Sequence, residues 1–185
     1  IIVSPVDGCL GEVGAVRHET LLQAKGRYYS LAALLAQQTH LVTLFLNAYY
    51  ITAYLAPRDY HRVHMPIAGR LMQMTFVPGD AYAVNAASIH AVDAVFARNE
   101  RVICIFDTAL GPMALILIGA MIVGSMVTSW HGEVRFASDS PTTIDYSKET
   151  IVLAKGQEMG YFQLGSSVIM LLPEQSIETT LISTL

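Results

Sequence analysis

Charged side chains are scarce in this chain. Only 14% of its 185 residues are charged, against about 25% in an average soluble domain. The formal net charge is −4 and no basic block occurs, so we expect no binding to nucleic-acid phosphates. The hydrophobic fraction of 53% and the mean hydropathy of +0.45 exclude a disordered chain. These values predict a single domain over residues 1–185, with a large core and an apolar surface that meets lipid, a partner or an apolar ligand.

Cysteine is also rare. Cys9 and Cys104 stand 95 positions apart, and the sequence contains no CxxC pair. A disulfide framework and a cysteine-rich zinc site are therefore excluded. We expect both cysteines to act as small hydrophobic residues of the core.

No apolar run reaches the length of about 20 residues that a transmembrane helix needs. The longest candidate, residues 113–127, has 15 residues and is interrupted by Gly119 and Gly124. Its β-branched side chains predict two buried strands joined near Gly119. The N-terminus shows neither a signal peptide nor an initiator Met, so we expect a trimmed or processed product.

Most of the chain has the pattern of strands separated by turns. Residues 43–55 and 101–107 are rich in aromatic and β-branched side chains, the first of them around a turn at Asn47. Residues 30–46 show the one convincing helical pattern, with Ser30 as the N-cap. The sequence therefore predicts an α+β protein that is predominantly β.

The densest group of chemically active side chains lies at residues 57–66, with the sequence PRDYHRVHMP. Histidine suits proton transfer because its usual pKa lies near neutrality. His61 and His64 would point to opposite faces of a strand but would lie together on a helical turn. A polar loop with one core histidine is the alternative. His61 and His64 lack the HExxH spacing of a zinc site. His90 and His131 could add metal ligands, but nothing in the sequence fixes their distance, so we expect no metal site.

A Gly-Ser pair near the C-terminal end places a hydroxyl directly after a residue with no side chain. The carbonyl of Gly165 is therefore open to attack by the Ser166 hydroxyl. An ordinary turn is the alternative, since the GxSxG nucleophile elbow and the phosphate-binding loop are both absent from the sequence. Asp7 and His64 would complete a carboxylate, imidazole and hydroxyl relay, but the sequence alone does not bring the three together.

Six segments spread over nearly the whole chain form a distinctive set: SPVDG at 4–8, QAKGRYYSL at 23–31, PRDYHRVHMP at 57–66, VPGD at 77–80, VFARNERVICIFDT at 95–108 and KGQEMGYFQLGSSVI at 155–169. In these segments the chain resembles the phosphatidylserine decarboxylase family in its bacterial, membrane-associated form.

The resemblance implies that the chain cuts itself between residues 165 and 166. Ser166 attacks the Gly165 carbonyl, and elimination then releases a β-chain of residues 1–165 from an α-chain of residues 166–185. The α-chain is left with a pyruvoyl group made from Ser166. The resemblance assigns the proton transfer to His64, oriented by Asp7. Ser167 replaces the Thr that is commoner at this position and keeps a hydroxyl group.

The resemblance further implies that the pyruvoyl carbonyl condenses with the amine of phosphatidylserine and serves as the electron sink for decarboxylation. His61 is the candidate that returns a proton, with Asp59 and Tyr60 as neighbours that orient it. The implied fold has hybrid-barrel, lipoyl-like strands with one or two short helices. The implied location is the cytoplasmic side of the cell membrane, as a peripheral protein, and the apolar composition leads us to expect a homo-oligomer.

Two other functions fit parts of the sequence. A serine hydrolase would use Asp7, His64 and Ser166 directly on a bound substrate and would keep the serine hydroxyl. A non-enzymatic, lipoyl-like carrier would need a modified lysine at the tip of a hairpin, and Lys155 before Gly156 is the best candidate for it.

Overall fold

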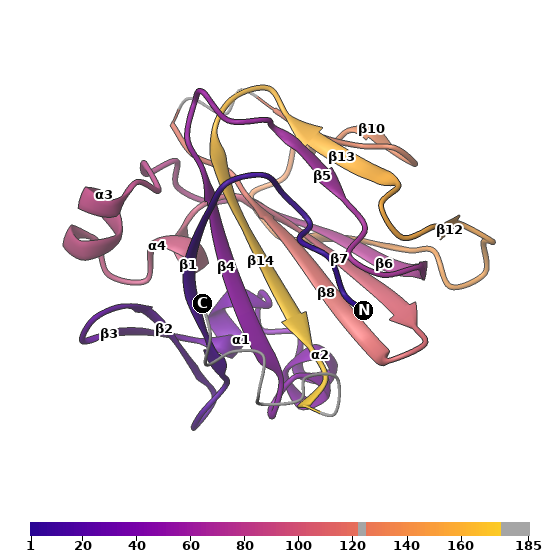
Figure 1. Cartoon of the computed structure of the whole chain (residues 1–185), viewed down its shortest axis with the longest axis horizontal. Coiled ribbons are helices and arrows are strands. Elements are labelled where there is room, and N and C mark those ends of the chain that lie inside the picture. Colours follow the sequence, from indigo (N-terminus) through magenta and orange to yellow (C-terminus); the bar gives the residue numbers. More distant parts are fainter. Residues whose placement is uncertain (122–124, 175–185) are drawn as a thin grey trace.

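The computed structural model describes residues 1–121 and 125–174, and strands dominate it (Figure 1). Four short helices are described: α1 (Leu31–Leu34), α2 (Thr39–Leu44), α3 (Ala86–Ala91) and α4 (Val95–Arg98). The strands are β1 (Cys9–Ala15), β2 (Thr20–Ala24), β3 (Arg27–Ser30), β4 (Tyr49–Leu55), β5 (Arg62–His64), β6 (Gly69–Val77), β7 (Arg101–Thr108), β8 (Gly111–Ile118), β9 (Met126–Thr128), β10 (Gly132–Glu133), β11 (Thr142–Asp145), β12 (Val152–Leu153), β13 (Glu158–Phe162) and β14 (Ser166–Leu172).

The largest sheet has the strand order β1-β4-β14-β8-β7-β6-β11, and β12 pairs with β6 beside it. All of its neighbouring strands are antiparallel. Strand β14 lies between β4 and β8, and all seven of its residues are buried. A strand whose side chains are buried on both faces needs cover on both faces of the sheet, so the apolar residues of β14, β8 and β7 form the centre of the hydrophobic core.

A smaller sheet with the order β10-β9-β13-β5 lies at one end of the large sheet, and β2 and β3 form a separate hairpin (Figure 1). Strand β5 belongs to the segment that carries both histidines of interest. Its partner β13 precedes β14 in the chain, so the small sheet joins the histidine segment to the Gly165–Ser166 bond.

The predicted class, α+β with a predominance of β, is confirmed. The large sheet stays open over the described residues, with β1 and β11 as its edges, and does not close into the barrel that the resemblance implied. The predicted break near Gly119 is also confirmed, since β8 ends at Ile118 and β9 belongs to the other sheet. Gly124, which the sequence also marked as an interruption, lies outside the described residues.

The single helix expected over residues 30–46 is wrong. Ser30 caps α1 as predicted, because its side chain accepts a hydrogen bond from the Ala33 amide. Ala36 and Gln37 then adopt positive φ angles of 55° and 59°, which a right-handed helix cannot contain, so α2 starts anew. Of the strands expected around Asn47 over residues 43–55, only β4 forms: residues 43 and 44 belong to α2, and residues 45–47 form a turn.

The two cysteines have different environments. Cys104, on β7, is fully buried as expected, and burial raises the pKa of its thiol. Cys9 is exposed, contrary to the expectation of a core residue. It begins β1, which is an edge strand and therefore leaves some of its side chains in solvent.

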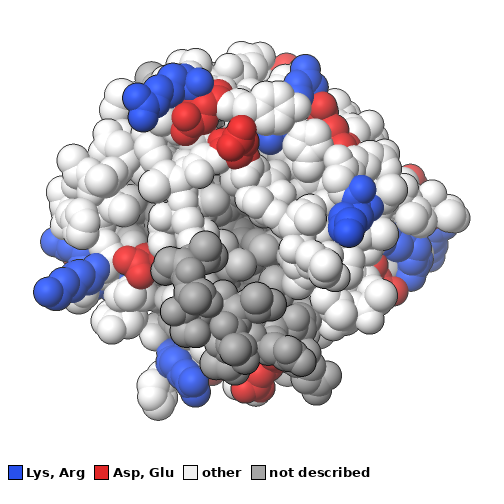
Figure 2. Space-filling view, in the orientation of Figure 1, with Lys and Arg blue, Asp and Glu red and all other residues white. Residues whose placement is uncertain are grey.

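The described surface carries few charges. Figure 2 shows the acidic and basic side chains of one face as small separate groups among uncharged atoms. No helix in the described ranges, 1–121 and 125–174, combines the length and the apolar character that a membrane crossing requires.

A buried arginine joins two of the helices to the large sheet. The guanidinium of Arg101, at the start of β7, donates to the carbonyls of Leu34 (2.8 Å) and Ala33 (2.6 Å) in α1. It also donates to Ala97 (2.8 Å) in α4 and to Asn99 (2.9 Å). These bonds give partners to carbonyls at and just beyond the ends of short helices, where intrahelical donors run out, although the Ala33 carbonyl also accepts from the Ala36 amide (3.3 Å). Burial lowers the pKa of Arg101 to about 10, so the side chain remains charged at neutral pH.

We therefore predict that Arg101→Lys lowers the thermal unfolding temperature. A single ammonium group cannot reach carbonyls in both helices, and each buried carbonyl left without a partner costs about 1–3 kcal/mol. For a domain of this size about 1 kcal/mol corresponds to about 2–4 °C, so we expect a fall of about 5 °C or more in calorimetry. Arg17→Lys, at an exposed arginine, is the matched control, and an equal shift in both variants would contradict the prediction.

Candidate functional site

The segment that links β4 to β5 carries three of the candidate side chains: Asp59, Tyr60 and His61. Strand β4 ends at Leu55, and a tight turn follows in which the Asp59 amide donates to the Ala56 carbonyl (2.9 Å). The Asp59 carboxylate accepts in return from the Ala56 amide (2.7 Å). This reciprocal pair closes the turn, so Asp59 shapes the loop. The expectation that Asp59 orients His61 stays a prediction.

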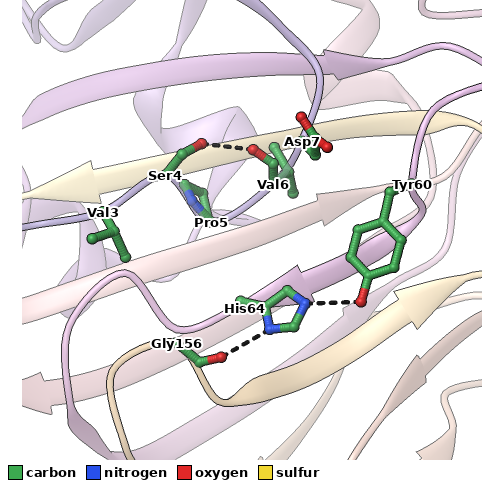
Figure 3. A pocket seen from close by; sticks show the side chains of 8 residues that line it. All are labelled: Val3, Ser4, Pro5, Val6, Asp7, Tyr60, His64 and Gly156. Atoms are coloured by element: carbon green, nitrogen blue, oxygen red, sulfur yellow. Dashed lines mark hydrogen bonds between the residues drawn. The ribbon is translucent and has the colours of Figure 1, made fainter.

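His64, at the end of β5, is held on three sides. Its backbone amide donates to the Pro5 carbonyl (2.8 Å), and β5 pairs with β13. Its ring lies between the Gly156 carbonyl, 2.9 Å from Nδ1, and the Tyr60 hydroxyl, 3.1 Å from Nε2 (Figure 3). The Tyr60 and His64 rings also stack, with centroids 5.8 Å apart and planes inclined by 17°. Tyr60 thus contacts His64, not His61.

Asp7 and His64 line one hollow of about 390 Å³, together with residues 3–6, Tyr60 and Gly156. The N-terminal segment reaches this place because the Val3 amide donates to the Pro66 carbonyl (3.0 Å), beside β5. Figure 3 shows Asp7 on the Tyr60 side of the hollow, with no hydrogen bond drawn between its carboxylate and His64. A neighbouring hollow is lined by Asp7, Gly8, Cys9, Arg58, Asp59 and Tyr60.

The Gly165–Ser166 bond lies at the entrance of β14 into the large sheet. Ser166 pairs with Leu55 of β4, and its buried hydroxyl donates to the Ile118 carbonyl at the end of β8. A Cβ atom on Gly165 would lie 2.8 Å from the Leu55 oxygen and 3.0 Å from the Pro57 nitrogen. The bond is therefore packed directly against the backbone where the 57–66 segment begins.

The structure brings the predicted residues into one region without joining them into a relay. Asp7 and His64 share a hollow, whereas Ser166 is not among the residues that line it. Both ring nitrogens of His64 bind other groups, so its transfer of a proton from Ser166 stays a prediction. The carbonyl of His61 accepts from the Phe162 amide (3.0 Å), and its buried Nε2 has no hydrogen-bond partner among the described residues.

Two features of the site had no clear signal in the sequence. The contact of Gly156 with His64 joins residues 92 positions apart, and only the pairing of β5 with β13 creates it. The Ser167 hydroxyl is buried and finds no partner in the described part of the chain. Over the same described residues, no group of three or more His, Cys, Asp or Glu side chains is arranged to hold a metal ion.

Comparison with known proteins identifies the family. The sequence model of the phosphatidylserine decarboxylase family matches residues 1–183. The chain belongs to this family. Curated phosphatidylserine decarboxylase proenzymes are similar to it: that of Delftia acidovorans is 51% identical over 174 residues, which are 92% of this chain and 61% of the relative. That of Coxiella burnetii is 45% identical over 177 residues, which are 96% of this chain and 63% of the relative.

The chain matches only part of the length of these relatives. The chain spans slightly more than 60% of the length of these phosphatidylserine decarboxylase proenzymes. The described part nevertheless contains all the segments on which the resemblance to the family rests, from the SPVDG segment at 4–8 to the KGQEMGYFQLGSSVI segment at 155–169.

We predict that Gly165→Ala destabilises the protein. The added methyl group would meet backbone atoms of Leu55 and Pro57, which cannot move without disturbing β4. Overpacking of this kind costs about 1–3 kcal/mol, so we expect the unfolding temperature to fall by about 3–10 °C in calorimetry. The measurement is made on the Ser166→Ala background, in which the chain is expected to stay intact.

The control for this prediction is Ser167→Ala, two positions away and equally buried. It removes a hydroxyl that has no described hydrogen-bond partner, so it should leave the unfolding temperature unchanged or raise it. If Gly165→Ala were as stable as this control, the close packing around Gly165 would not constrain the protein.

Proposed function

We propose that this chain decarboxylates phosphatidylserine to phosphatidylethanolamine, with a pyruvoyl group that it makes by cutting itself between Gly165 and Ser166. The family assignment supports the reaction class. The observation that carries the proposal is the position of the bond: Ser166 is buried with its hydroxyl inside the sheet, directly after a glycine that has no room for a side chain. A buried serine whose nearest reactive carbonyl is that of the preceding residue suits attack on the chain itself.

Self-cleavage begins with the Ser166 hydroxyl. It has to turn from the Ile118 carbonyl to the Gly165 carbonyl carbon, while a base removes its proton. A new C–O bond forms and the C–N bond to Ser166 breaks, which converts the amide into an ester. Loss of the Ser166 α-proton then expels the Gly165 carboxylate and leaves dehydroalanine, which takes up water and releases ammonia.

His64 is the base in this proposal, and Asp7 supports it. The two side chains line the same hollow, so a carboxylate stands near the imidazolium that forms when His64 accepts the proton. The segment between β4 and β5 links this hollow to the backbone packed against Gly165. Ser166 does not line this hollow, so the His64 ring or Ser166 has to move before the first step.

Residue 166 fits the precursor of a pyruvoyl group, because it is a serine that would become the first residue of the α-chain. A pyruvoyl group there supplies an electrophilic carbonyl that withdraws electrons as carbon dioxide leaves. His61 is the proposed donor of the proton that replaces the carboxyl group. Its buried Nε2 has no described hydrogen-bond partner, so the atom is available for such a transfer.

The two products of cleavage should stay together. The α-chain would begin with β14, whose seven residues pair with β4 on one side and, over five of them, with β8 on the other. These hydrogen bonds and the buried apolar side chains do not depend on the peptide bond that is cut. The sheet would hold the new chain end of residue 166 beside Leu55.

We also propose that the protein works as a peripheral protein on the cytoplasmic side of the cell membrane, as a homo-oligomer. Its substrate would be a lipid of the bilayer, and the low charge of the chain favours contact with apolar partners. Tyr60 and Leu164 are exposed and lie close in the chain to His61 and to the scissile bond, where a lipid head group would have to arrive.

The burial of Ser166 argues against a serine hydrolase. A hydrolase needs its serine hydroxyl at the surface of a substrate pocket, whereas Ser166 is fully buried and lines neither hollow. Lys155 does lie at an exposed turn, as a carrier would need. A carrier, however, gives no role to His61 and His64 or to the close packing of Gly165.

An intact-mass spectrum under denaturing conditions tests self-cleavage. We expect a β-chain that ends at Gly165 and an α-chain with the remaining 20 of the 185 residues. The α-chain should be lighter by one ammonia than the peptide that starts with Ser166. Ser166→Ala should give one uncut chain, and a normally cut Ser166→Ala protein would overturn the scheme.

The role of His61 is tested by separating cleavage from decarboxylation. His61→Ala should still be cut, because the proposal gives His61 no part in that step, but release of carbon dioxide from phosphatidylserine in detergent micelles should fall by about 100-fold or more. His90→Ala, at an exposed histidine on α3, is the control and should keep full activity. Undiminished release by His61→Ala would remove His61 from the reaction.

A further inference from the structure

The hydrogen bonds of His64 define which of its nitrogens is basic. A backbone carbonyl can only accept a hydrogen bond, so Nδ1, 2.9 Å from the Gly156 oxygen, must carry the proton. In the neutral ring Nε2 is then the unprotonated nitrogen. The Tyr60 hydroxyl, 3.1 Å away, donates to it. The one lone pair that could accept a proton from Ser166 is therefore occupied by Tyr60.

The two partners of His64 differ in how firmly they are held. Gly156 lies in a turn with a φ of +79°, and its amide donates to the Met65 carbonyl (2.8 Å). The Met65 amide donates in return to the Gln157 carbonyl (2.8 Å). The Gly156 carbonyl is thus part of the backbone frame next to β5. Tyr60 is a side chain on a loop, 48% exposed, and it can swing into solvent.

We propose that Tyr60 controls when His64 can act as a base: its hydroxyl blocks Nε2 in the uncut chain and has to leave before cleavage begins. The Gly156 carbonyl keeps the proton on Nδ1 and so leaves the free lone pair on Nε2. This inference rests on the proposed self-cleavage. It makes Tyr60 a positioning residue, since it acts through His64 and not on the reacting atoms.

The proton transfer that follows is balanced within the chain. The Tyr60 hydroxyl keeps its proton and turns to water or solvent. Nε2 of His64 then accepts the proton of the Ser166 hydroxyl, as the oxygen bonds to the Gly165 carbonyl carbon. The resulting imidazolium donates from Nδ1 to Gly156 and stands in the hollow that contains the Asp7 carboxylate. It returns its proton to the new amine of residue 166 as the C–N bond breaks.

Tyr60→Phe tests the proposal, because it keeps the ring that stacks on His64 and removes only the hydroxyl. The full chain is made by cell-free synthesis, and the uncut fraction is followed on denaturing gels. Removal of one competing hydrogen bond should shorten the half-time of cleavage by about three- to tenfold. Tyr28→Phe, at an exposed tyrosine on the β2–β3 hairpin, is the control and should cut at the rate of the unaltered chain.

A half-time for Tyr60→Phe that equals or exceeds that of the unaltered chain would overturn the proposal. Slower cleavage would mean that the hydroxyl assists His64. To separate this from a folding defect, the unfolding temperature of Tyr60→Phe is compared with that of the parent on the Ser166→Ala background.

A second measurement does not depend on cleavage. The full chain with Ser166→Ala and ¹⁵N-labelled histidine is studied by long-range ¹H–¹⁵N correlation at about pH 8.5, where an ordinary histidine is neutral. The His64 signals, assigned by their loss in His64→Gln, should show a protonated Nδ1 and an unprotonated Nε2. Adding Tyr60→Phe should shift the Nε2 signal and leave the tautomer unchanged.

The opposite tautomer, with the proton on Nε2, would overturn the inference whether or not the chain cuts itself. If the tautomer were as expected but the unaltered chain never cut, the proposed function would fail and the description of His64 would stand. The two failures are therefore distinguishable.

Discussion

The pairing of β14 with two strands at once is the constraint on which the rest of the structure depends. Its backbone is shared between β4 and β8, and all of its residues are buried. Because β14 begins at Ser166, the same pairing that completes the core also places the Gly165–Ser166 bond at the edge of that core. Stability and the proposed chemistry therefore use one strand: its middle holds the sheet together, and its first residue is the one that would be modified.

The candidate site is assembled from three segments that are far apart in the sequence. Residues 3–7 run beside β5, β5 carries His64, and the turn before β13 supplies the Gly156 carbonyl. Each segment is held by backbone hydrogen bonds, so the hollow does not depend on the side chains that line it. The exception is Tyr60, whose exposed ring reaches His64 from a loop. A hydrogen-bonded backbone frame with one exposed side chain would suit the proposed cleavage, which has to occur once, after folding.

The sequence predicted some secondary-structure elements correctly and others wrongly. The apolar runs of β7 and β8 were predicted as buried strands, because such runs have no stable place except the interior of a sheet. The helix expected over residues 30–46 was wrong, since periodicity does not reveal that Ala36 and Gln37 take positive φ angles. The exposure of Cys9 was also missed, because a strand's position at the edge of a sheet is set by its neighbours and not by its own residues.

The sequence by itself determined the predominance of strands and the identity of the family, because both depend on residue types and short motifs within single segments. It also marked His61, His64, Asp7, Gly165 and Ser166 as the residues with chemistry to offer. Only the tertiary structure decided what these residues touch. It paired His64 with Gly156 and Tyr60, turned the Ser166 hydroxyl to Ile118, and packed Gly165 against the end of β4. The physical reason is that a hydrogen bond between distant segments depends on strand register, which the whole core sets and no local motif records.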